Sequence, residues 1–225
     1  NPLTMRINPK LALLVISVFV SVLTVEAILQ VFFFNYFPPL TGGYRNAFDS
    51  TLGWFPVPND RATGNGPSFA NNSMGLRGGE FQQTGKVGIM FLGDSFVWGH
   101  SIPAVEERFT EKIQARHPEW NIYNLGVVGY GTDQEFLLLQ RVFDRLRPRI
   151  VFLVFCTEND HENNSASFCF SCYKPHFTTN ATGLQLHGIP VPCSENMYCA
   201  AHPLLSRSHL FRLVVRVWKK FTLPP

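Results

Sequence analysis

Charged residues are scarce in this chain. Asp, Glu, Lys and Arg make up 16% of its 225 residues, whereas they make up about 25% of a typical soluble domain. The hydrophobic fraction of 45% is too high for a disordered chain, and the net charge of +3 is too small to indicate binding to nucleic acid. The length is sufficient for one α/β domain and a membrane anchor.

Charge is almost absent from residues 11–34. One acid, Glu26, and a few uncharged polar residues interrupt this apolar run, which at ~1.5 Å per residue can span a hydrocarbon core of about 30 Å. No small-residue cleavage site follows, so the run predicts an uncleaved transmembrane anchor rather than a signal peptide. A buried core helix is the alternative. A carboxylate at membrane depth is costly and often marks a partner, although Glu26 lies toward the outer end.

Basic residues are missing from the C-terminal flank of the run. Arg6 and Lys10 precede it, and the next basic residue is Arg45. Under the positive-inside rule, the N-terminus is cytoplasmic and the main domain is periplasmic or extracellular. We therefore expect a single-pass membrane protein whose partners are the lipid bilayer and, through Leu11–Phe34 or a basic helix at 204–221, other subunits of a membrane complex.

Cysteine is sparse outside one segment. Cys156 ends an apolar run and is expected to be a buried thiol. The other four cysteines share an insertion at residues 161–203: Cys169, Cys172, Cys193 and Cys199. Outside the cytoplasm, such a cluster predicts two disulfides, with the pairing left open. The alternative is a zinc site with four thiolate ligands, because Cys169 and Cys172 have ligand spacing.

Apolar strands alternate with helices after a Gly-, Pro- and Asn-rich segment at residues 35–85, which we expect to wrap onto the domain. In chain order, the predicted elements are strand 86–92, helix 103–117, strand 121–125, helix 134–146, strand 150–155 and helix 204–221. The wholly apolar run Ile150–Phe155 is typical of a strand buried on both faces. The order predicts a parallel, three-layer α/β domain at residues 86–225, with a cytoplasmic segment at residues 1–10.

Polar blocks follow the three predicted strands. They are Gly93-Asp94-Ser95, Asn124-Leu125-Gly126 with the nearby Gly129, and Glu158-Asn159-Asp160. In their order and position they resemble the blocks of the SGNH (GDSL-type) hydrolase family, in particular a membrane-anchored bacterial branch with O-acyl esterases and transferases. The resemblance covers roughly residues 68–165 and implies a flavodoxin-like, three-layer fold.

The resemblance implies a serine site at the carboxyl ends of the strands. Ser95 would be the nucleophile. The backbone N–H groups of Ser95 and Gly129 and the side chain of Asn159 would form the oxyanion hole. Three donors that converge on one point can stabilise the negative oxygen of a tetrahedral intermediate. No cofactor and no metal are implied.

This chain has no counterpart of the motif that supplies the general base in the family. That base is a histidine in a late D-x-x-H block, which this chain lacks, and no aspartate follows Asp160. His161 and His100 lie close to the blocks in sequence, but neither has the position that the family uses. Because a serine without a base is a weak nucleophile, we expect the chain as it stands to be inactive.

Two interpretations remain open. In the first, the protein is an SGNH-type serine esterase or O-acyl transferase that acts on ester-linked acyl groups outside the cytoplasmic membrane, with its base in a continuation of the chain. Hydrolysis and transfer share the same acyl-serine, so both are included. In the second, the domain is catalytically incomplete and is a structural or accessory subunit of a membrane protein complex.

Overall fold

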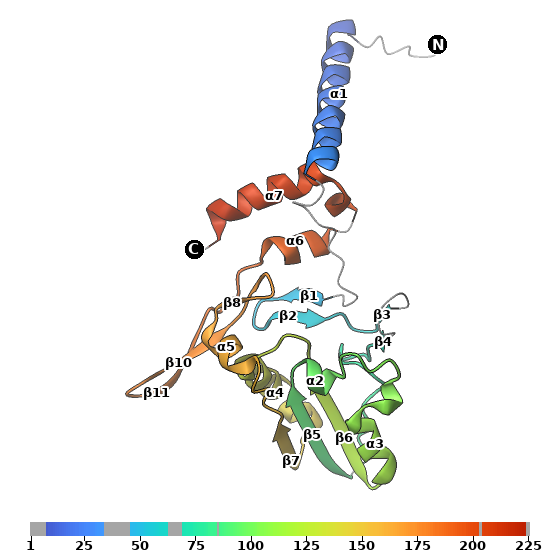
Figure 1. Cartoon of the computed structure of the whole chain (residues 1–225), viewed down its shortest axis with the longest axis vertical. Coiled ribbons are helices and arrows are strands. Elements are labelled where there is room, and N and C mark those ends of the chain that lie inside the picture. Colours follow the sequence, from blue (N-terminus) through green and yellow to red (C-terminus); the bar gives the residue numbers. More distant parts are fainter. Residues whose placement is uncertain (1–7, 34–45, 63–68, 85, 203, 224–225) are drawn as a thin grey trace, which may run out of the picture. The chain divides into compact units, whose positions relative to one another are not determined.

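The chain folds into two units in the computed structural model. Unit 1 combines the two ends of the chain, residues 1–41 and 202–225, and unit 2 comprises residues 42–201. The structure describes five stretches: residues 8–33, 46–62, 69–84, 86–202 and 204–223. Figure 1 labels the helices and strands of these stretches.

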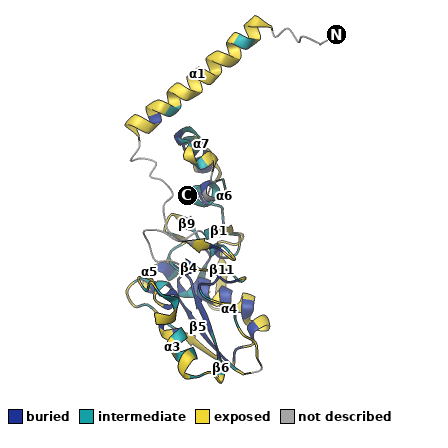
Figure 2. Cartoon of the chain, turned by 90° about the vertical axis from the view of Figure 1, so that its right-hand side faces the viewer, coloured by how far each residue is buried: buried dark blue, intermediate teal, exposed yellow. Residues whose placement is uncertain are grey.

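The long helix of unit 1 is α1 (Pro9–Phe32). It begins after Asn8, whose side chain accepts a hydrogen bond from the backbone N–H of Lys10 (3.0 Å), and proline suits the first helical position because no N–H partner is needed there. Helix α1 is long and apolar enough to cross a membrane, and nearly all of its side chains are exposed (Figure 2). It coincides with the anchor predicted at residues 11–34, whose last residue lies outside the described stretches.

Unit 1 also contains the last helix of the described chain. A 3₁₀ turn, η3 (Leu205–Arg207), leads into helix α7 (His209–Thr222). Ser208 caps α7, because its Oγ accepts a hydrogen bond from the backbone N–H of Phe211 (3.1 Å). The α/β domain predicted at residues 86–225 includes this helix, whereas its contacts group it with α1 through Glu26.

Unit 2 is built on a parallel sheet of three strands in the order β6-β5-β7. The strands are β5 (Val87–Gly93), β6 (Trp120–Gly126) and β7 (Ile150–Leu153). Helix α3 (Phe109–Arg116) connects β5 to β6, and helix α4 (Thr132–Leu146) connects β6 to β7. The α/β class that the sequence predicts is confirmed.

Alternate residues of β5 pack into two apolar clusters. Met90 and Leu92 belong to a large cluster with buried residues of α4, whereas Ile89 and Phe91 belong to a second cluster that includes Ile113 of α3. Parallel strands are joined by right-handed crossovers. A chain that moves from β5 to β6 and then back past β5 to β7 therefore places its two crossover helices on opposite faces. Strand β5 lies between them and is buried along nearly its whole length (Figure 2).

Strand β7 differs from the prediction. Its four residues are 36–50% exposed rather than buried on both faces, because β7 pairs with β5 alone in the described sheet. Phe152 stacks on Phe91 of β5 at a centroid distance of 5.1 Å. An apolar composition thus identified the strand, but it did not identify its place at the edge of the sheet.

Short strands occupy part of the segment that we expected to be irregular. They form two antiparallel pairs: β1 (Asn46–Asp49) with β2 (Gly53–Pro56), and β3 (Arg61–Ala62) with β4 (Phe69–Ala70). Leu52, Trp54 and Leu76 from this segment are buried in the large cluster with β5 and α4. The segment therefore contributes to the core of unit 2. Residues 35–45, 63–68 and 85 lie outside the described stretches.

The insertion after β7 consists of short elements. In chain order, these are α5 (Asp160–Ser165), β8 (Phe168–Cys169), β9 (Cys172–Tyr173), β10 (His176–Asn180), β11 (Gly183–His187) and α6 (Glu195–Ala201). Strands β8 and β9 form one antiparallel pair, and β10 and β11 form another. Two further elements precede α3: α2 (Ser95–Trp98) and the 3₁₀ turn η2 (Val105–Glu107).

Alanine substitutions of one buried leucine and one exposed leucine test which side chains the fold buries. Leu138 of α4 is fully buried, whereas Leu153 of β7 is 50% exposed. Leu138→Ala should lower the free energy of unfolding by about 2–5 kcal/mol, because it leaves a cavity. Leu153→Ala should lower it by about 1 kcal/mol or less. Urea denaturation of each variant in detergent, followed by tryptophan fluorescence, measures both losses. Equal losses would mean that β7 is covered in solution.

Candidate functional site at the end of strand β5

Ser95 lies in a tight turn at the carboxyl end of β5. Asp94 follows the strand directly and caps the one-turn helix α2, because its Oδ1 accepts a hydrogen bond from the backbone N–H of Phe96 (2.8 Å). Ser95 is the first residue of α2 and is half-buried. Gly99 ends the helix with a φ of 83°, in the left-handed region that favours glycine. The turn therefore holds Ser95 at the strand end.

Two glycines allow α2 to lie directly on the strand ends. A Cβ atom at Gly126 of β6 would be 2.1 Å from the backbone nitrogen of Trp98, and a Cβ atom at Gly93 would be 2.3 Å from Cγ2 of Val97. Any side chain at either position would displace the turn. The glycines of the first two blocks thus have a packing role that sequence reasoning did not assign to them.

Asn159 reaches the same carboxylate as Ser95. Its Nδ2 donates to Asp94 Oδ2 at 3.3 Å, and the hydroxyl of Ser95 donates to the same oxygen at 3.4 Å. Asn159 lies beyond β7, so the ends of two strands meet at Asp94. Both distances exceed the usual range of about 2.7–3.2 Å, so the hydroxyl and the amide are held weakly. An amide nitrogen carries two hydrogens, and one remains for another acceptor.

Gly129 lies three residues beyond β6, at the same edge of the sheet, because Gly93 and Gly126 are register partners. Its φ of 81° requires glycine. A Cβ atom at Gly129 would lie 2.9 Å from the ring of Phe170 and 3.5 Å from that of Trp54. The structure therefore brings Ser95 and Asn159 together at Asp94 and places Gly129 beside Phe170.

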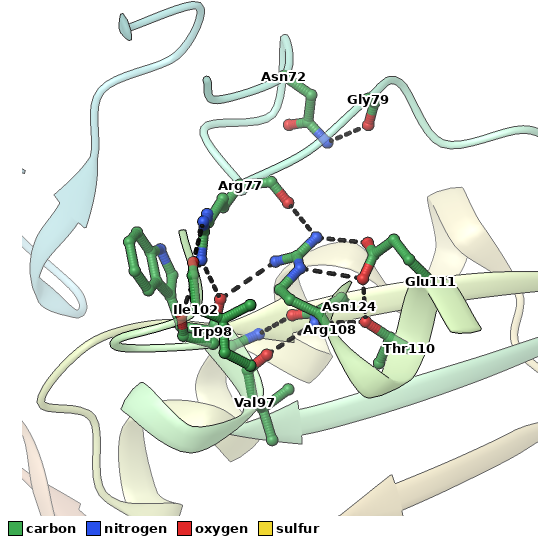
Figure 3. Close-up of polar contacts among 12 residues, drawn as sticks. Asn72, Arg77, Gly79, Val97, Trp98, Ile102, Arg108, Thr110, Glu111 and Asn124 are labelled. Carbon is green, nitrogen blue, oxygen red and sulfur yellow. Dashed lines mark hydrogen bonds and ion pairs between the residues drawn. The ribbon is translucent and has the colours of Figure 1, made fainter. Parts of the chain in front are cut away.

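Two buried arginines hold the backbone that follows Ser95 (Figure 3). The carbonyl oxygen of Trp98 accepts hydrogen bonds from Nη1 of Arg77 (3.3 Å) and Nη1 of Arg108 (3.2 Å). Arg77 also donates to the carbonyl oxygens of Gly99 (2.8 Å) and Ile102 (2.7 Å). Its guanidinium group lies 4.4 Å from the centroid of the Trp98 ring, as in a cation–π contact. The loop after the serine is therefore fixed by side chains.

The two arginines are joined to each other and to α3. Arg108 donates to the carbonyl oxygen of Arg77 (2.9 Å) and, through Nε, to the carboxylate of Glu111 (3.0 Å). Both guanidinium groups are almost fully buried, and bidentate contacts suit their planar geometry. Asn124 of β6 completes the arrangement, because its Nδ2 donates to the carbonyl oxygen of Val97 (2.7 Å).

A pocket of about 400 Å³ lies beside this arginine pair. It is lined by residues of the segment 77–84, of α3 and of β6, but not by Ser95, Gly129 or Asn159. The predicted serine site is therefore separate from this pocket.

No histidine of the described stretches accepts a hydrogen bond from the hydroxyl of Ser95, whose acceptor is Asp94. His161 is exposed in α5, and its ring contacts Phe155 edge-on at a centroid distance of 5.0 Å. His100 is exposed as well, and its backbone N–H donates to the carbonyl oxygen of Ser95 (2.8 Å). Neither ring is therefore in place as a general base.

Buried acids surround the turn on the α4 side. Glu135 is fully buried, and neither carboxylate oxygen has a hydrogen-bond partner among the residues that the structure describes. Burial, reinforced by the charges of Asp160, Asp94 and Asp133, raises its pKa to about 8. Glu135 is therefore protonated at neutral pH. The sequence offered a signal, because Glu135 has helical spacing with the apolar residues of α4 that face the core.

The other acids of this group have partners. Asp133 forms a buried ion pair with Lys174, which also donates to the carbonyl oxygen of Asn163 (2.8 Å). Asp160 accepts a hydrogen bond from the backbone N–H of Cys156 (2.6 Å). Burial raises the pKa of both Asp133 and Asp160. Lys174 therefore anchors the insertion to α4.

The cysteines of the insertion are thiols, so the two predicted disulfides are not formed in the structure. Cys169 and Cys172 face each other across β8 and β9, but each thiol has another environment. Cys169 Sγ donates to Asn163 Oδ1 (3.2 Å), and Cys172 packs in the large apolar cluster, where burial raises its pKa. In the described stretches, no group of three His, Cys, Asp or Glu side chains is arranged to hold a metal ion.

No family model matches the chain, and no curated protein matches it either. The resemblance to SGNH hydrolases therefore depends on the three sequence blocks and on how the chain arranges them.

Gly126→Ala tests the close packing of α2 on the strand ends. The new methyl group would overlap the backbone of Trp98, so we expect a loss of about 2 kcal/mol or more in the free energy of unfolding. Gly79→Ala is the matched control, because no atom lies within 4 Å of its Cβ position. Denaturant titration of both variants measures the difference. A Gly126→Ala variant as stable as Gly79→Ala would contradict the packing.

Glu135 makes stability depend on pH. The folded state keeps a proton that the unfolded state releases above its ordinary pKa of 4.5. Stability should therefore fall as pH rises from about 4.5 to about 8, by roughly 3–5 kcal/mol in total from this residue. Glu135→Gln stays neutral and should flatten this dependence. Urea denaturation across this range measures the slope.

Glu158→Gln, at an exposed position, is the control for that experiment. In this variant, the free energy of unfolding should depend on pH as it does in the unmodified chain. If Glu135→Gln also keeps that slope, Glu135 is ionised in the folded protein and the buried, protonated acid is refuted.

Proposed function

We propose that this protein is a membrane-anchored serine esterase or O-acyl transferase of the SGNH type, which acts on ester-linked acyl groups outside the cytoplasmic membrane. Helix α1 is the anchor, and its N-terminus is cytoplasmic. Ser95 is the nucleophile, and the oxyanion donors are the backbone N–H groups of Ser95 and Gly129 and the side chain of Asn159. Substrate class and orientation rest on the sequence resemblance and on the charges that flank the anchor.

The observation that carries the proposal is the shared carboxylate oxygen of Asp94. Ser95 and Asn159 come from blocks that are 64 positions apart in the sequence, and both donate to this oxygen. They follow β5 and β7, which are neighbours in the sheet. Open α/β sheets place their sites at the carboxyl ends of strands, where strand order reverses. The turn after β5 is such a position.

The strand order gives further support. Numbered by sequence, β5, β6 and β7 lie in the order 2-1-3, which is how the flavodoxin-like order 2-1-3-4-5 begins. The flavodoxin-like fold of the SGNH family remains part of the proposal, because three strands are compatible with other α/β folds.

The chemistry follows from these residues. Ser95 Oγ attacks the carbonyl carbon of the ester while its proton passes to a base, and the carbonyl oxygen becomes an oxyanion. The donors at Ser95, Gly129 and Asn159 stabilise that oxyanion. The bond to the alcohol then breaks, and the alcohol leaves with the proton from the base. The acyl group on Ser95 passes to water in hydrolysis or to another hydroxyl group in transfer.

The base is the part of the site that the described residues do not supply. In the family it is an imidazole, and general-base assistance typically contributes about 10²–10⁴ in rate. The chain on its own should therefore react slowly and should respond to added imidazole.

The edge strand favours a second candidate function. Strand β7 exposes four apolar residues and has β5 as its partner in the described sheet. Native folds avoid long apolar edges, which readily pair with other chains. A structural or accessory subunit of a membrane complex would cover this edge with a neighbouring subunit. In that function, Ser95 need not react at all.

Phosphonylation of Ser95 tests the proposed function. The full chain in detergent is treated with a fluorophosphonate, with and without imidazole, and the peptide that carries Ser95 is analysed by mass spectrometry. We expect slow labelling that imidazole accelerates and that Ser95→Ala abolishes. Asn159→Ala should lower the imidazole-assisted rate by about 10²–10³, whereas the exposed Asn180→Ala should not change it.

The outcomes separate the two candidates. Absence of a Ser95 adduct under both conditions would refute the nucleophile and favour the accessory subunit. Fast labelling of Ser95 without imidazole would support the esterase, but it would also show that the chain supplies a general base of its own. Equal rates in Asn159→Ala and the unmodified chain would remove Asn159 from the oxyanion hole.

A further inference from the structure

Helix α1 determines where a membrane surface would meet unit 1. Its 24 residues extend for about 36 Å at ~1.5 Å per residue, slightly more than a hydrocarbon core of about 30 Å. Its side chains are exposed on every face, apart from Leu29 and the partly buried Ala12 and Glu26. Glu26 and Leu29 share a face of the helix. Their lower exposure marks where another part of unit 1 packs.

Glu26 binds the N-terminus of α7. Its carboxylate accepts hydrogen bonds from the backbone N–H groups of His209 (2.8 Å) and Leu210 (2.9 Å) and from the hydroxyl of Ser208 (2.8 Å). The first N–H groups of a helix lack partners within the helix, and the N-terminal end of the helix dipole favours a negative charge. The acid in the apolar helix therefore has a specific partner. It fixes α7 to one level along α1.

In a bilayer that α1 spans, Glu26 lies near the boundary between the acyl chains and the headgroups. Glu26 lies six residues before Phe32, the last residue of α1, which corresponds to about 9 Å along the helix axis. Interfacial amphipathic helices lie roughly 5–10 Å deep in the zone between headgroups and acyl chains. If α1 spans the bilayer, α7 begins at this depth.

Helix α7 presents an exposed apolar face. Val214, Val217, Trp218 and Phe221 follow the spacing i, i+3, i+4 and i+7, so they lie on one side of the helix. They are 46–83% exposed. Tryptophan is enriched at membrane interfaces, where its ring meets both apolar and polar groups.

The rest of this segment is basic in composition: Arg207, Arg216 and Lys220 are exposed or partly exposed, whereas Arg212 and Lys219 are buried. No Asp or Glu occurs after residue 203, and five basic residues do: Arg207, Arg212, Arg216, Lys219 and Lys220. Anionic lipids attract such a segment, and long basic side chains can extend from an apolar environment to the headgroups.

The geometry points to α7 as an interfacial helix that lies in the bilayer surface, with Val214, Val217, Trp218 and Phe221 in the acyl boundary and Glu26 as its fixed attachment to the anchor. The occupant of the exposed face is lipid. The inference rests on the proposed crossing of the bilayer by α1, and it is independent of the chemistry at Ser95. It gives the chain a second membrane contact, which would hold unit 1 at a fixed depth and restrict its rotation.

Quenching of Trp218 by lipid tests this inference. The full chain is reconstituted in vesicles of phosphatidylcholine and phosphatidylglycerol whose acyl chains carry bromine near the headgroup. The emission of Trp218 is the difference between the unmodified chain and Trp218→Phe. We expect this difference emission to lose most of its intensity in brominated vesicles. Val217→Asp should restore much of it, whereas Thr179→Asp, at an exposed position of unit 2, should restore little.

The result is read against extraction with alkaline carbonate, which tests α1 separately. A chain that resists extraction but shows no quenching of Trp218 overturns the inference and leaves the anchor standing. The same holds if Phe221→Cys forms a disulfide with a second copy, because protein then covers the face. If alkaline carbonate extracts the chain, α1 is not a transmembrane anchor, and the inference about α7 fails with it. This outcome is independent of any reaction at Ser95.

Glu26→Gln tests the attachment itself. The amide keeps the size of the side chain but lacks the charge and one acceptor, so the N-terminus of α7 should loosen. Hydrogen exchange at the first turn of α7 should accelerate at least several-fold, while exchange in α4 of unit 2 stays constant. Unchanged exchange in α7 would refute the role of Glu26.

Discussion

The arrangement at the end of β5 depends on the buried carboxylate of Asp94. One oxygen fixes the first turn of α2, and the other accepts from Ser95 and Asn159. A buried carboxylate is stable only when hydrogen bonds replace its lost hydration. Those bonds come from two separate strand ends, so the requirement to satisfy one charge draws Ser95 and Asn159 together.

The surroundings of Asp94 restrict that turn further. Gly93 and Gly126 let α2 lie on the backbone of the sheet, and Arg77 and Arg108 bind the carbonyl groups that follow it. On the other side, burial raises the pKa of Glu135, and the neighbouring acids Asp160, Asp94 and Asp133 reinforce the shift. The site is thus rigid in its backbone. Its polar side chains, held by long hydrogen bonds, remain available to a substrate.

Much of the fold could be predicted because its signals are local. The apolar runs that became β5 and β6, the periodicity of α4 and the long apolar run of the anchor each lie within one segment. The polar blocks could be placed at one sheet edge because parallel strands end together. Exposure of Phe152 could not be predicted, because an edge strand and a central strand can have the same composition.

The contacts that sequence reasoning missed join distant parts of the chain. Arg77 binds the loop at Trp98, and Glu26 caps α7 across 182 positions of sequence. Neither residue type is specific to such a role, so only the fold reveals the partner. The disulfides that the cysteine spacing indicates stay a prediction. In the structure the cysteines are free thiols, with Cys169 hydrogen-bonded to Asn163 and Cys172 packed in the large apolar cluster.

If Ser95 is the nucleophile, the oxygen of an acyl group on it would meet the donors of Gly129 and Asn159. A crystal structure of the chain with Ser95 phosphonylated in the presence of imidazole measures this directly. We expect the phosphonyl oxygen to accept hydrogen bonds from Asn159 Nδ2 and from the backbone N–H groups of Ser95 and Gly129. A phosphonyl oxygen that faces solvent, with Asn159 still bound to Asp94 and Gly129 out of reach, would contradict this expectation.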